Sequence, residues 1–204
     1  VNGANTTSTV RQLADGRAGS FDGGNDYVSL PSSPNFAFGT GPFTVTLWFN
    51  TNTISIASCL FSLGGSNTYY GALYANYPSL GYMYHANGTR ISDLSVLSAN
   101  TWYFLTFVGN GGADGSRNMK LYRNGVQVGS TYTYNYNFPQ QAFVIGANQS
   151  AYSEVMHGSI DDIRIYNYAR TAGQILADYD AGSAMHLSAS TDPNEGNPPV
   201  GYWT

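Results

Sequence analysis

Phe143-Val-Ile-Gly146 and His157-Gly-Ser-Ile-Asp-Asp-Ile-Arg-Ile-Tyr-Asn-Tyr-Ala-Arg170 are the stretches that decide the fold. Both are rich in β-branched and aromatic residues, which is typical of strands. The second runs directly into a short segment with helical spacing. Together with Phe21-Asp-Gly-Gly-Asn-Asp-Tyr-Val28 near the other end, they predict the outer strands of a β-sandwich that ends at about Gly182.

The segments between these ends also predict strands. Residues 43–49 alternate apolar and hydroxyl side chains, as a strand buried on one face must. Residues 102–108 form a nearly continuous apolar run of strand length. Asn124-Gly125 stands between two alternating segments, which predicts a β-hairpin with a type I′ turn.

One helix is predicted after the last strand. Thr171 can cap it, and Gln174 three residues later completes a capping box. Ile175, Leu176 and Tyr179 form its apolar stripe. The sequence thus predicts an all-β, two-sheet antiparallel β-sandwich with one short C-terminal helix. The predicted domain organisation is a polar lead-in (1–17), the sandwich (18–182) and an extended C-terminal tail (183–204).

The composition narrows the functional class. Charged residues make up 10% of the chain, the net charge is −4, and Lys120 is the single lysine. Phosphate binding needs clustered Lys and Arg, so a nucleic-acid partner is not expected. No apolar run approaches the roughly 18 residues that a membrane-spanning helix needs. The polarity comes from Asn, Ser, Thr and Gly, which favours an extracellular or cell-surface protein, and the start at Val1 suggests a processed or trimmed chain.

These motifs, in this order, resemble laminin-G-like jelly-roll domains of the concanavalin A-like lectin/glucanase superfamily. The matching segments are residues 21–28, 43–49, 102–107, 121–125 and 158–167, so the resemblance covers about residues 18–182. It implies a jelly-roll sandwich. It does not imply one function, because the fold is used by lectins, adhesins, enzyme-appended binding modules and structural domains.

Catalysis is not expected. Glycoside hydrolysis needs two carboxylates about 5–10 Å apart. The chain has two glutamates, Glu154 and Glu195, and neither lies in an alternating acidic strand. Asp161 and Asp162 are adjacent, so in a regular strand they point to opposite faces.

A structural calcium ion is one possible cofactor. Strand periodicity places Asp161 on the inward face with Ile163 and Ile165, where a carboxylate needs a partner. By the resemblance, a calcium near the first and last strands would be held by Asp22, Asp26 and Asp161. The alternative is that these carboxylates cap loop amides or pair with an arginine.

Two tyrosine-rich segments are candidates for a carbohydrate-binding site, an interface, or simple cross-strand packing. Their members are Tyr69, Tyr70, Tyr74, Tyr82, Tyr84, Tyr132, Tyr134 and Tyr136. Three sequons, at Asn5, Asn87 and Asn148, predict N-glycosylation in loops or in the lead-in. The lone Cys59 is predicted to be a buried core thiol.

The tail suggests a function of its own. Its large apolar and proline residues are unusual at a chain end: Pro198, Pro199, Val200, Tyr202 and Trp203. Docked on another copy, such a tail would give head-to-tail, filament-like self-assembly of a secreted, non-catalytic structural or adhesive protein. The tail could instead fold back on its own domain. The alternative function is a carbohydrate-binding, lectin-like module that is either calcium-dependent or not.

Overall fold

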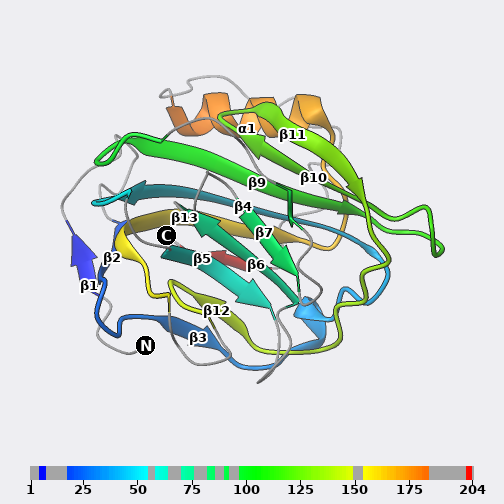
Figure 1. Cartoon of the computed structure of the whole chain (residues 1–204), viewed down its shortest axis with the longest axis horizontal. Coiled ribbons are helices and arrows are strands. Elements are labelled where there is room, and N and C mark those ends of the chain that lie inside the picture. Colours follow the sequence, from blue (N-terminus) through cyan, green and yellow to red (C-terminus); the bar gives the residue numbers. More distant parts are fainter. Residues whose placement is uncertain are drawn as a thin grey trace.

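The computed structural model describes residues 5–7, 18–54, 58–63, 70–75, 82–85, 90–91, 97–148, 154–183 and 201–203. In residues 5–7, 70–75, 82–85, 90 and 201–203 the backbone alone is described. These residues form two antiparallel sheets, one α-helix and one short 3₁₀ helix, as Figure 1 shows. The predicted two-sheet sandwich is confirmed.

The larger sheet has eight strands, in the order β1-β2-β13-β4-β9-β10-β11, with β14 pairing to β13. Their bounds are β1 Asn5–Thr7, β2 Ala18–Asp22, β13 His157–Tyr166, β4 Pro42–Thr51, β9 Trp102–Asn110, β10 Asn118–Arg123, β11 Val126–Thr133 and β14 Gly201–Trp203. β2, from the first part of the chain, and β14, from its last part, therefore both pair with β13.

The smaller sheet has six strands, in the order β3-β12-β5-β6-β7-β8. Their bounds are β3 Val28–Leu30, β12 Phe143–Ile145, β5 Ser58–Leu63, β6 Tyr70–Ala75, β7 Tyr82–His85 and β8 Arg90–Ile91. The 3₁₀ helix η1 spans Pro34–Phe36, and the α-helix α1 spans Ala172–Ser183. Within the described residues no helix is long and apolar enough to cross a membrane.

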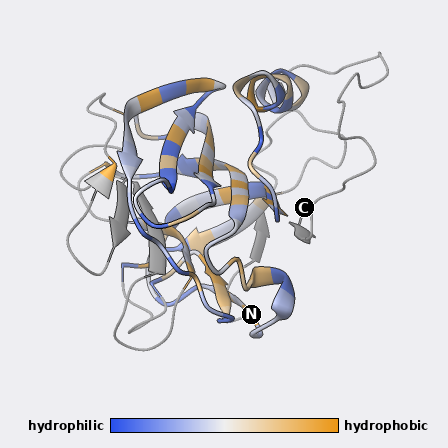
Figure 2. Cartoon of the chain, turned by 90° about the vertical axis from the view of Figure 1, so that its right-hand side faces the viewer, coloured by the Kyte–Doolittle hydropathy of each residue, from blue (hydrophilic) through white to orange (hydrophobic). Residues whose placement is uncertain are grey.

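The main core lies between the two sheets. In β4, Phe43, Val45, Leu47 and Phe49 belong to this core, whereas the intervening residues face the other way. Figure 2 shows the resulting bands of hydrophobic and hydrophilic colour along the strands. Cys59 is buried, as predicted. Its burial and, as a smaller cause, the nearby negative charge of Glu154 raise the pKa of the thiol well above the ordinary value.

A second apolar cluster lies on the outer face of the eight-stranded sheet, under α1. It contains Trp48, Phe104, Val108, Tyr122 and Ile175. The predicted capping box is present at the start of the helix. The Thr171 hydroxyl accepts a hydrogen bond from Gln174 N at 3.2 Å, and the Gln174 side chain accepts one from Thr171 N at 2.8 Å. A short helix like this depends on such a packed face.

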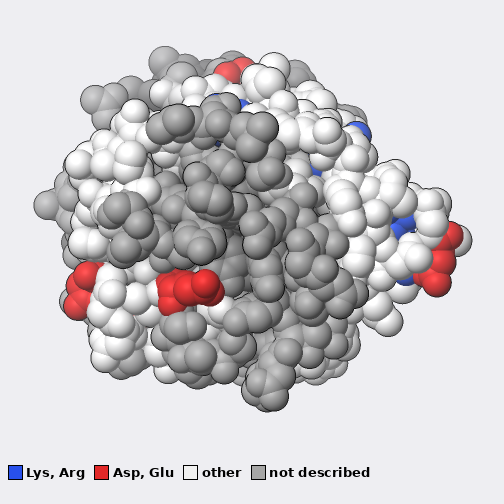
Figure 3. All heavy atoms as spheres, viewed as in Figure 1, with Lys and Arg blue, Asp and Glu red and all other residues white. Residues whose placement is uncertain are grey.

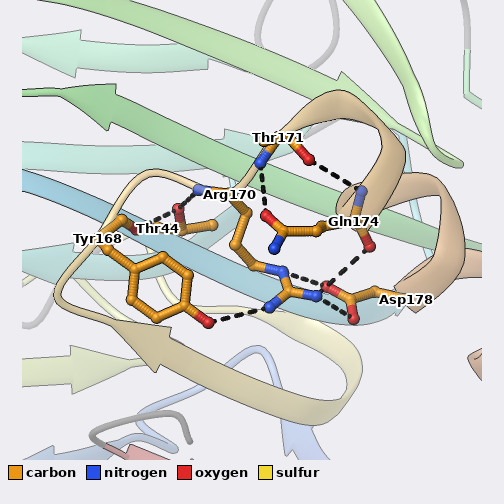
Figure 4. Close-up of polar contacts among 6 residues, drawn as sticks. All are labelled: Thr44, Tyr168, Arg170, Thr171, Gln174 and Asp178. Atoms are coloured by element: carbon orange, nitrogen blue, oxygen red, sulfur yellow. Dashed lines mark hydrogen bonds and ion pairs between the residues drawn. The ribbon is translucent and has the colours of Figure 1, made fainter. Parts of the chain in front are cut away.

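A buried ion pair also holds α1 on the sheet. Figure 4 shows the Arg170 guanidinium between the Tyr168 hydroxyl and the Asp178 carboxylate. Its Nε and Nη2 atoms lie 2.7 and 2.8 Å from the two Asp178 oxygens. The backbone N–H of Arg170 donates to the Thr44 hydroxyl of β4 at 3.0 Å. The segment before the helix is therefore attached to the middle of the sheet.

The predicted hairpin joins β10 to β11. Arg123 pairs with Val126, and Asn124 and Gly125 have φ values of 50° and 81°. Positive φ at both central residues is what a type I′ turn requires. The Asn124 side chain also accepts a hydrogen bond from Phe104 N at 2.9 Å, which connects the turn to β9.

The predicted orientation of Asp161 is wrong. Asp161 pairs with Trp48 and Arg164 pairs with Thr46, so β13 contains one extra residue, a β-bulge. Asp162 has a φ of 50° within this bulge. The extra residue shifts the alternation, so Asp161 shares the outer face with Trp48, and Ile160 and Ile163 both reach the core.

Candidate functional site

The second tyrosine segment divides into buried and half-buried members. Tyr136 is 1% exposed and belongs to the core, where its ring meets Phe43 edge-on at 5.6 Å. Its hydroxyl accepts a hydrogen bond from Gly111 N at 2.6 Å and donates one to Gly41 O at 3.0 Å. Burial raises the pKa of this hydroxyl, although Gly111 N–H and Arg117 act in the opposite direction. Tyr136 is therefore a packing residue and not part of a surface site.

Tyr136→Phe is expected to lower the free energy of unfolding by about 1–3 kcal/mol, because it leaves Gly111 N–H and Gly41 C=O without their buried partner. For a domain of this size the melting temperature should fall by roughly 2–4 °C per kcal/mol. Thermal unfolding followed by circular dichroism measures the change. An unchanged melting temperature would contradict this structural role of the Tyr136 hydroxyl.

Tyr132 and Tyr134 lie at the rim of the core. Both are half-buried, and their rings stack with centroids 6.3 Å apart. They pack against the main core beside the edge strand β11, which also lies against β8. Part of this aromatic pair is therefore open at the edge of the sandwich.

An uncharged polar cluster covers the opposite face of the same edge, and we call it the amide corner. It consists of Asn110, Ser116, Asn118, Thr133 and Asn135, at the ends of β9, β10 and β11. All are exposed except the half-buried Asn118. Thr133 Oγ1 donates to Asn118 Oδ1 at 2.8 Å, and Asn118 N donates to Asn110 Oδ1 at 2.5 Å. The side chains are thus held in place while remaining open to solvent.

A buried arginine supports the loop that borders the amide corner. Arg117 is 4% exposed, donates to Gly112 O at 2.9 Å and forms an ion pair with Asp114. Asp114 has 77% of its side chain exposed. The charges of this pair balance, and its exposed member is the carboxylate. Figure 3 shows that charged atoms form only small separate spots on the visible face, where most described atoms are neither acidic nor basic.

The polar residues of this segment were not among the predicted site residues. The alternation of Tyr with Thr and Asn over residues 131–137 predicts two different faces and leaves open whether the tyrosines form a binding site, an interface or simple packing. In the structure the tyrosines pack against the main core. The polar residues Thr133 and Asn135 are the exposed ones. Asn110 and Asn118 were not predicted at all. Their signal is weak: they are the asparagines that flank the glycine-rich stretch 111–115 at two strand ends.

The first tyrosine segment lies in the six-stranded sheet. Tyr74 pairs with Tyr82, Tyr84 with Ala72, and Tyr70 with His85. Directly opposed residues of an antiparallel pair have Cα atoms about 4.5–5.5 Å apart, so the register brings these positions together. Tyr69 lies outside the described residues. A sugar-binding or interface role for this group stays a prediction.

The structure places Asp161 apart from the other two predicted calcium ligands, Asp22 and Asp26. Asp26 Oδ2 accepts from Asp22 N at 2.9 Å, and Asp22 Oδ1 accepts from Gly24 N at 2.7 Å, so both carboxylates cap their own turn. Asp22 pairs with His157, which lies four residues before Asp161 on β13. Along the strand, Asp161 is therefore about 13 Å from the position opposite Asp22. Among the described residues no group of three or more His, Cys, Asp or Glu could hold a metal ion. A three-aspartate site is therefore not formed.

The sequon asparagines have different environments. Asn148 is 1% exposed, and its side chain donates to Glu154 Oε2 at 2.8 Å. A buried, hydrogen-bonded amide cannot carry a bulky glycan, so the prediction for Asn148 is wrong. Asn5 lies in β1, opposite Ser20, and Asn87 lies outside the described residues. Glycosylation at these two positions stays a prediction.

The end of the tail pairs with its own domain. Gly201–Trp203 form β14, in which Tyr202 pairs with Arg164 and Trp203 with Ile163 of β13. This is the alternative in which the tail folds back. It gives no support to head-to-tail docking, because β14 already occupies a sheet edge in its own chain. Pro198, Pro199 and Val200 lie outside the described residues.

Comparison with known proteins agrees with the fold. One similar solved structure is domain 4 of an extracellular arabinanase from Geobacillus stearothermophilus, in complex with arabinotriose. Its TM-score is 0.69 and its sequence identity is 18%, and the match covers 87% of this chain and 81% of that chain. The CBM40 domain of a Ruminococcus gnavus sialidase, bound to α2,3-sialyllactose, has a TM-score of 0.59 and 12% identity, over 76% and 96%. The binding domain of botulinum neurotoxin serotype G has a TM-score of 0.62 and 12% identity, over 90% of this chain and 48% of that chain.

Sequence comparison gives the family. No curated protein sequence matches the chain significantly. The family model described as the concanavalin A-like lectin/glucanases superfamily matches residues 22–176, which is most of the sandwich and the first turn of α1. The chain belongs to the concanavalin A-like lectin/glucanases superfamily.

Proposed function

We propose that this protein is a secreted, non-catalytic carbohydrate-binding module. The observation that carries the proposal is the edge strand β11, with exposed amide and hydroxyl groups on one face and the half-buried Tyr132–Tyr134 pair on the other. Sugars present hydroxyl groups and apolar C–H faces. Binding sites for small ligands combine a few fixed polar groups with apolar and aromatic surface. A sugar chain that crosses an edge strand can contact both faces.

The charges favour a neutral ligand. The amide corner contains no charged side chain, and the Arg117–Asp114 pair next to it exposes its carboxylate and buries its guanidinium, so it offers no exposed cation to an acidic sugar. The net charge of −4 acts in the same direction. Of the two ligands in similar structures, arabinotriose is the better match and α2,3-sialyllactose the poorer one. The extracellular location of the similar arabinanase supports secretion.

The test is isothermal titration calorimetry of the full chain with neutral arabino-oligosaccharides and with sialyllactose, each with and without Ca²⁺. We expect measurable binding of a neutral oligosaccharide. If Asp22 or Asp26 holds calcium at the turn after β2, adding Ca²⁺ should change the affinity or the melting temperature. Heat signals at background level with every sugar, confirmed on a wider glycan array, would refute the proposal.

The site is tested with Thr133→Val, which removes one exposed hydroxyl while nearly conserving shape. Losing one hydrogen bond of about 0.5–1.5 kcal/mol should weaken binding roughly 2- to 10-fold. Thr101→Val is the matched control. Thr101 is also exposed, but it lies just before β9, and Asn110 of the amide corner is at the opposite end of that strand. That places it about 30 Å from the amide corner. Equal effects of the two variants would place the sugar elsewhere.

A further inference from the structure

One side of β13 is shared by two strands from opposite ends of the chain. β2 pairs with residues 157–160, and β14 pairs with residues 163–165. Between them lies the bulge at Asp161–Asp162. The other side of β13 is filled by β4 along almost its full length. Figure 1 shows β13 in the interior of the eight-stranded sheet.

The segment 163–165 needs a partner strand on the β14 side. Ile163 and Ile165 are 3% and 0% exposed and belong to the main core. Among the described strands, only β14 pairs with this side of the segment. Without β14 it would be a sheet edge with unpaired N–H and C=O groups beside buried side chains. Such an edge is a template for pairing with another chain.

The strand that meets this need lies at the end of the chain. Residues 184–200 separate α1 from β14, so the same three residues could reach the same register from a second copy. We propose that residues 163–165 of β13 form a strand-acceptor site that the C-terminal strand of another copy also fits. Two copies then exchange β14 reciprocally. Each copy gives its β14 to the other and receives the other's β14, so no acceptor site stays open. The product is therefore a closed two-fold dimer and not a filament.

The balance between the two pairings depends on concentration. The contacts of β14 with β13 are the same within and between chains, so they cancel in the comparison. Within one chain, a tethered segment typically has an effective concentration in the millimolar range. The monomer should therefore dominate at micromolar concentration, and the exchanged dimer should reach about half of the protein near the millimolar range. This inference does not depend on the carbohydrate proposal.

The first experiment measures the mass of the full chain by sedimentation equilibrium from about 10 µM to a few mM. We expect monomer at the low end and a rising dimer fraction at the high end. Mixing ¹⁵N-labelled and unlabelled chains should give mixed dimers by native mass spectrometry. Monomer alone over the whole range, or assemblies that grow beyond dimers, would overturn the proposal.

The second experiment asks whether the dimer uses β14. Successive N–H groups of a strand point to opposite sides, so of Gly201 and Tyr202 one directs its N–H toward β13. Proline has no N–H, so replacing both residues by proline removes this hydrogen-bond donor. The double variant G201P/Y202P should lose the dimer, whereas the control G201A/Y202F keeps its ladder and should retain it. A dimer that persists in the proline variant would show that another surface makes it.

The third experiment detects the acceptor directly, using the peptide of residues 196–204 with a fluorescent label. It should bind G201P/Y202P, whose own strand cannot pair, about ten-fold or more tightly than the unchanged chain, whose strand occupies the site. Circular dichroism establishes that the variant keeps its sheets. Equal binding to both proteins, or binding to neither folded protein, would refute the acceptor site.

Discussion

Arg170→Ala is expected to lower the free energy of unfolding by about 3–5 kcal/mol, because it leaves the Asp178 carboxylate buried without its partner. The side chains of Arg170 and Asp178 are only 4% and 12% exposed. The guanidinium also lies 4.6 Å from the centre of the Tyr166 ring and donates to the Tyr168 hydroxyl at 3.2 Å. Burial alone lowers the pKa of Arg170, but Asp178 and the two tyrosines raise it overall, so the charge is retained.

The measurement is urea unfolding followed by circular dichroism, with wild type and variant compared at the same pH. A loss of this size is a large share of the 5–15 kcal/mol that a typical domain has. Arg123→Ala is the matched control. That arginine is half-buried over the Tyr103 ring at 5.8 Å, and its loss should cost about 1 kcal/mol or less.

A double variant separates the charge effect from packing. Arg170→Met with Asp178→Leu replaces the ion pair by apolar side chains and leaves no buried charge. Such replacements are often close to neutral, so most of the lost stability should return. If the double variant is as unstable as Arg170→Ala, the packing and hydrogen bonds of Arg170 matter more than its pairing with Asp178.

Gly158→Ala is expected to cost about 3 kcal/mol or more, because no room exists for a Cβ atom there. Gly158 has a φ of 148°, and an added Cβ would lie 2.0 Å from Asn50 O and 2.9 Å from Thr51 Cα. Both obstacles are backbone atoms of β4, and β2 pairs on the other side at Phe21. Relief therefore requires moving a strand of the sheet. The melting temperature should fall by roughly 6–12 °C.

Gly173→Ala is the matched control for this substitution. Gly173 lies in the first turn of α1, and an added Cβ would have nothing within 4 Å. Alanine favours helix over glycine, so the variant should be more stable by about 0.5–1 kcal/mol. A comparable loss of stability in both variants would mean that the close approach of β13 to β4 is not what makes Gly158 necessary.

Features that depend on neighbouring residues were predictable. The Asn124-Gly125 hairpin, the alternation in β4 and the Thr171–Gln174 capping box all follow from the chemistry of a few adjacent positions. Each was confirmed with its expected partners. The end of α1 at Ser183 also lies within one residue of the predicted one.

The candidate site was much less predictable. One extra residue at Asp161–Asp162 reversed the expected face of Asp161, and period-two counting cannot detect such a residue. Asn148 has a sequon but is buried against Glu154, which only the folded loop reveals. In the tyrosine segment the pattern showed two alternating faces and did not say which one meets the core.

The sequence alone determined the sandwich, its hairpin, its helix and its family, because these depend on local periodicity, turn chemistry and motif order. Tertiary structure alone decided the rest: the polar face of β11 is exposed, Asp161 lies apart from Asp22 and Asp26, and the terminal strand lies on β13. The physical reason is that strand pairing joins residues far apart in the chain. Which side chain is exposed is set by the partner strand and the opposite sheet, and neither can be inferred from neighbouring residues.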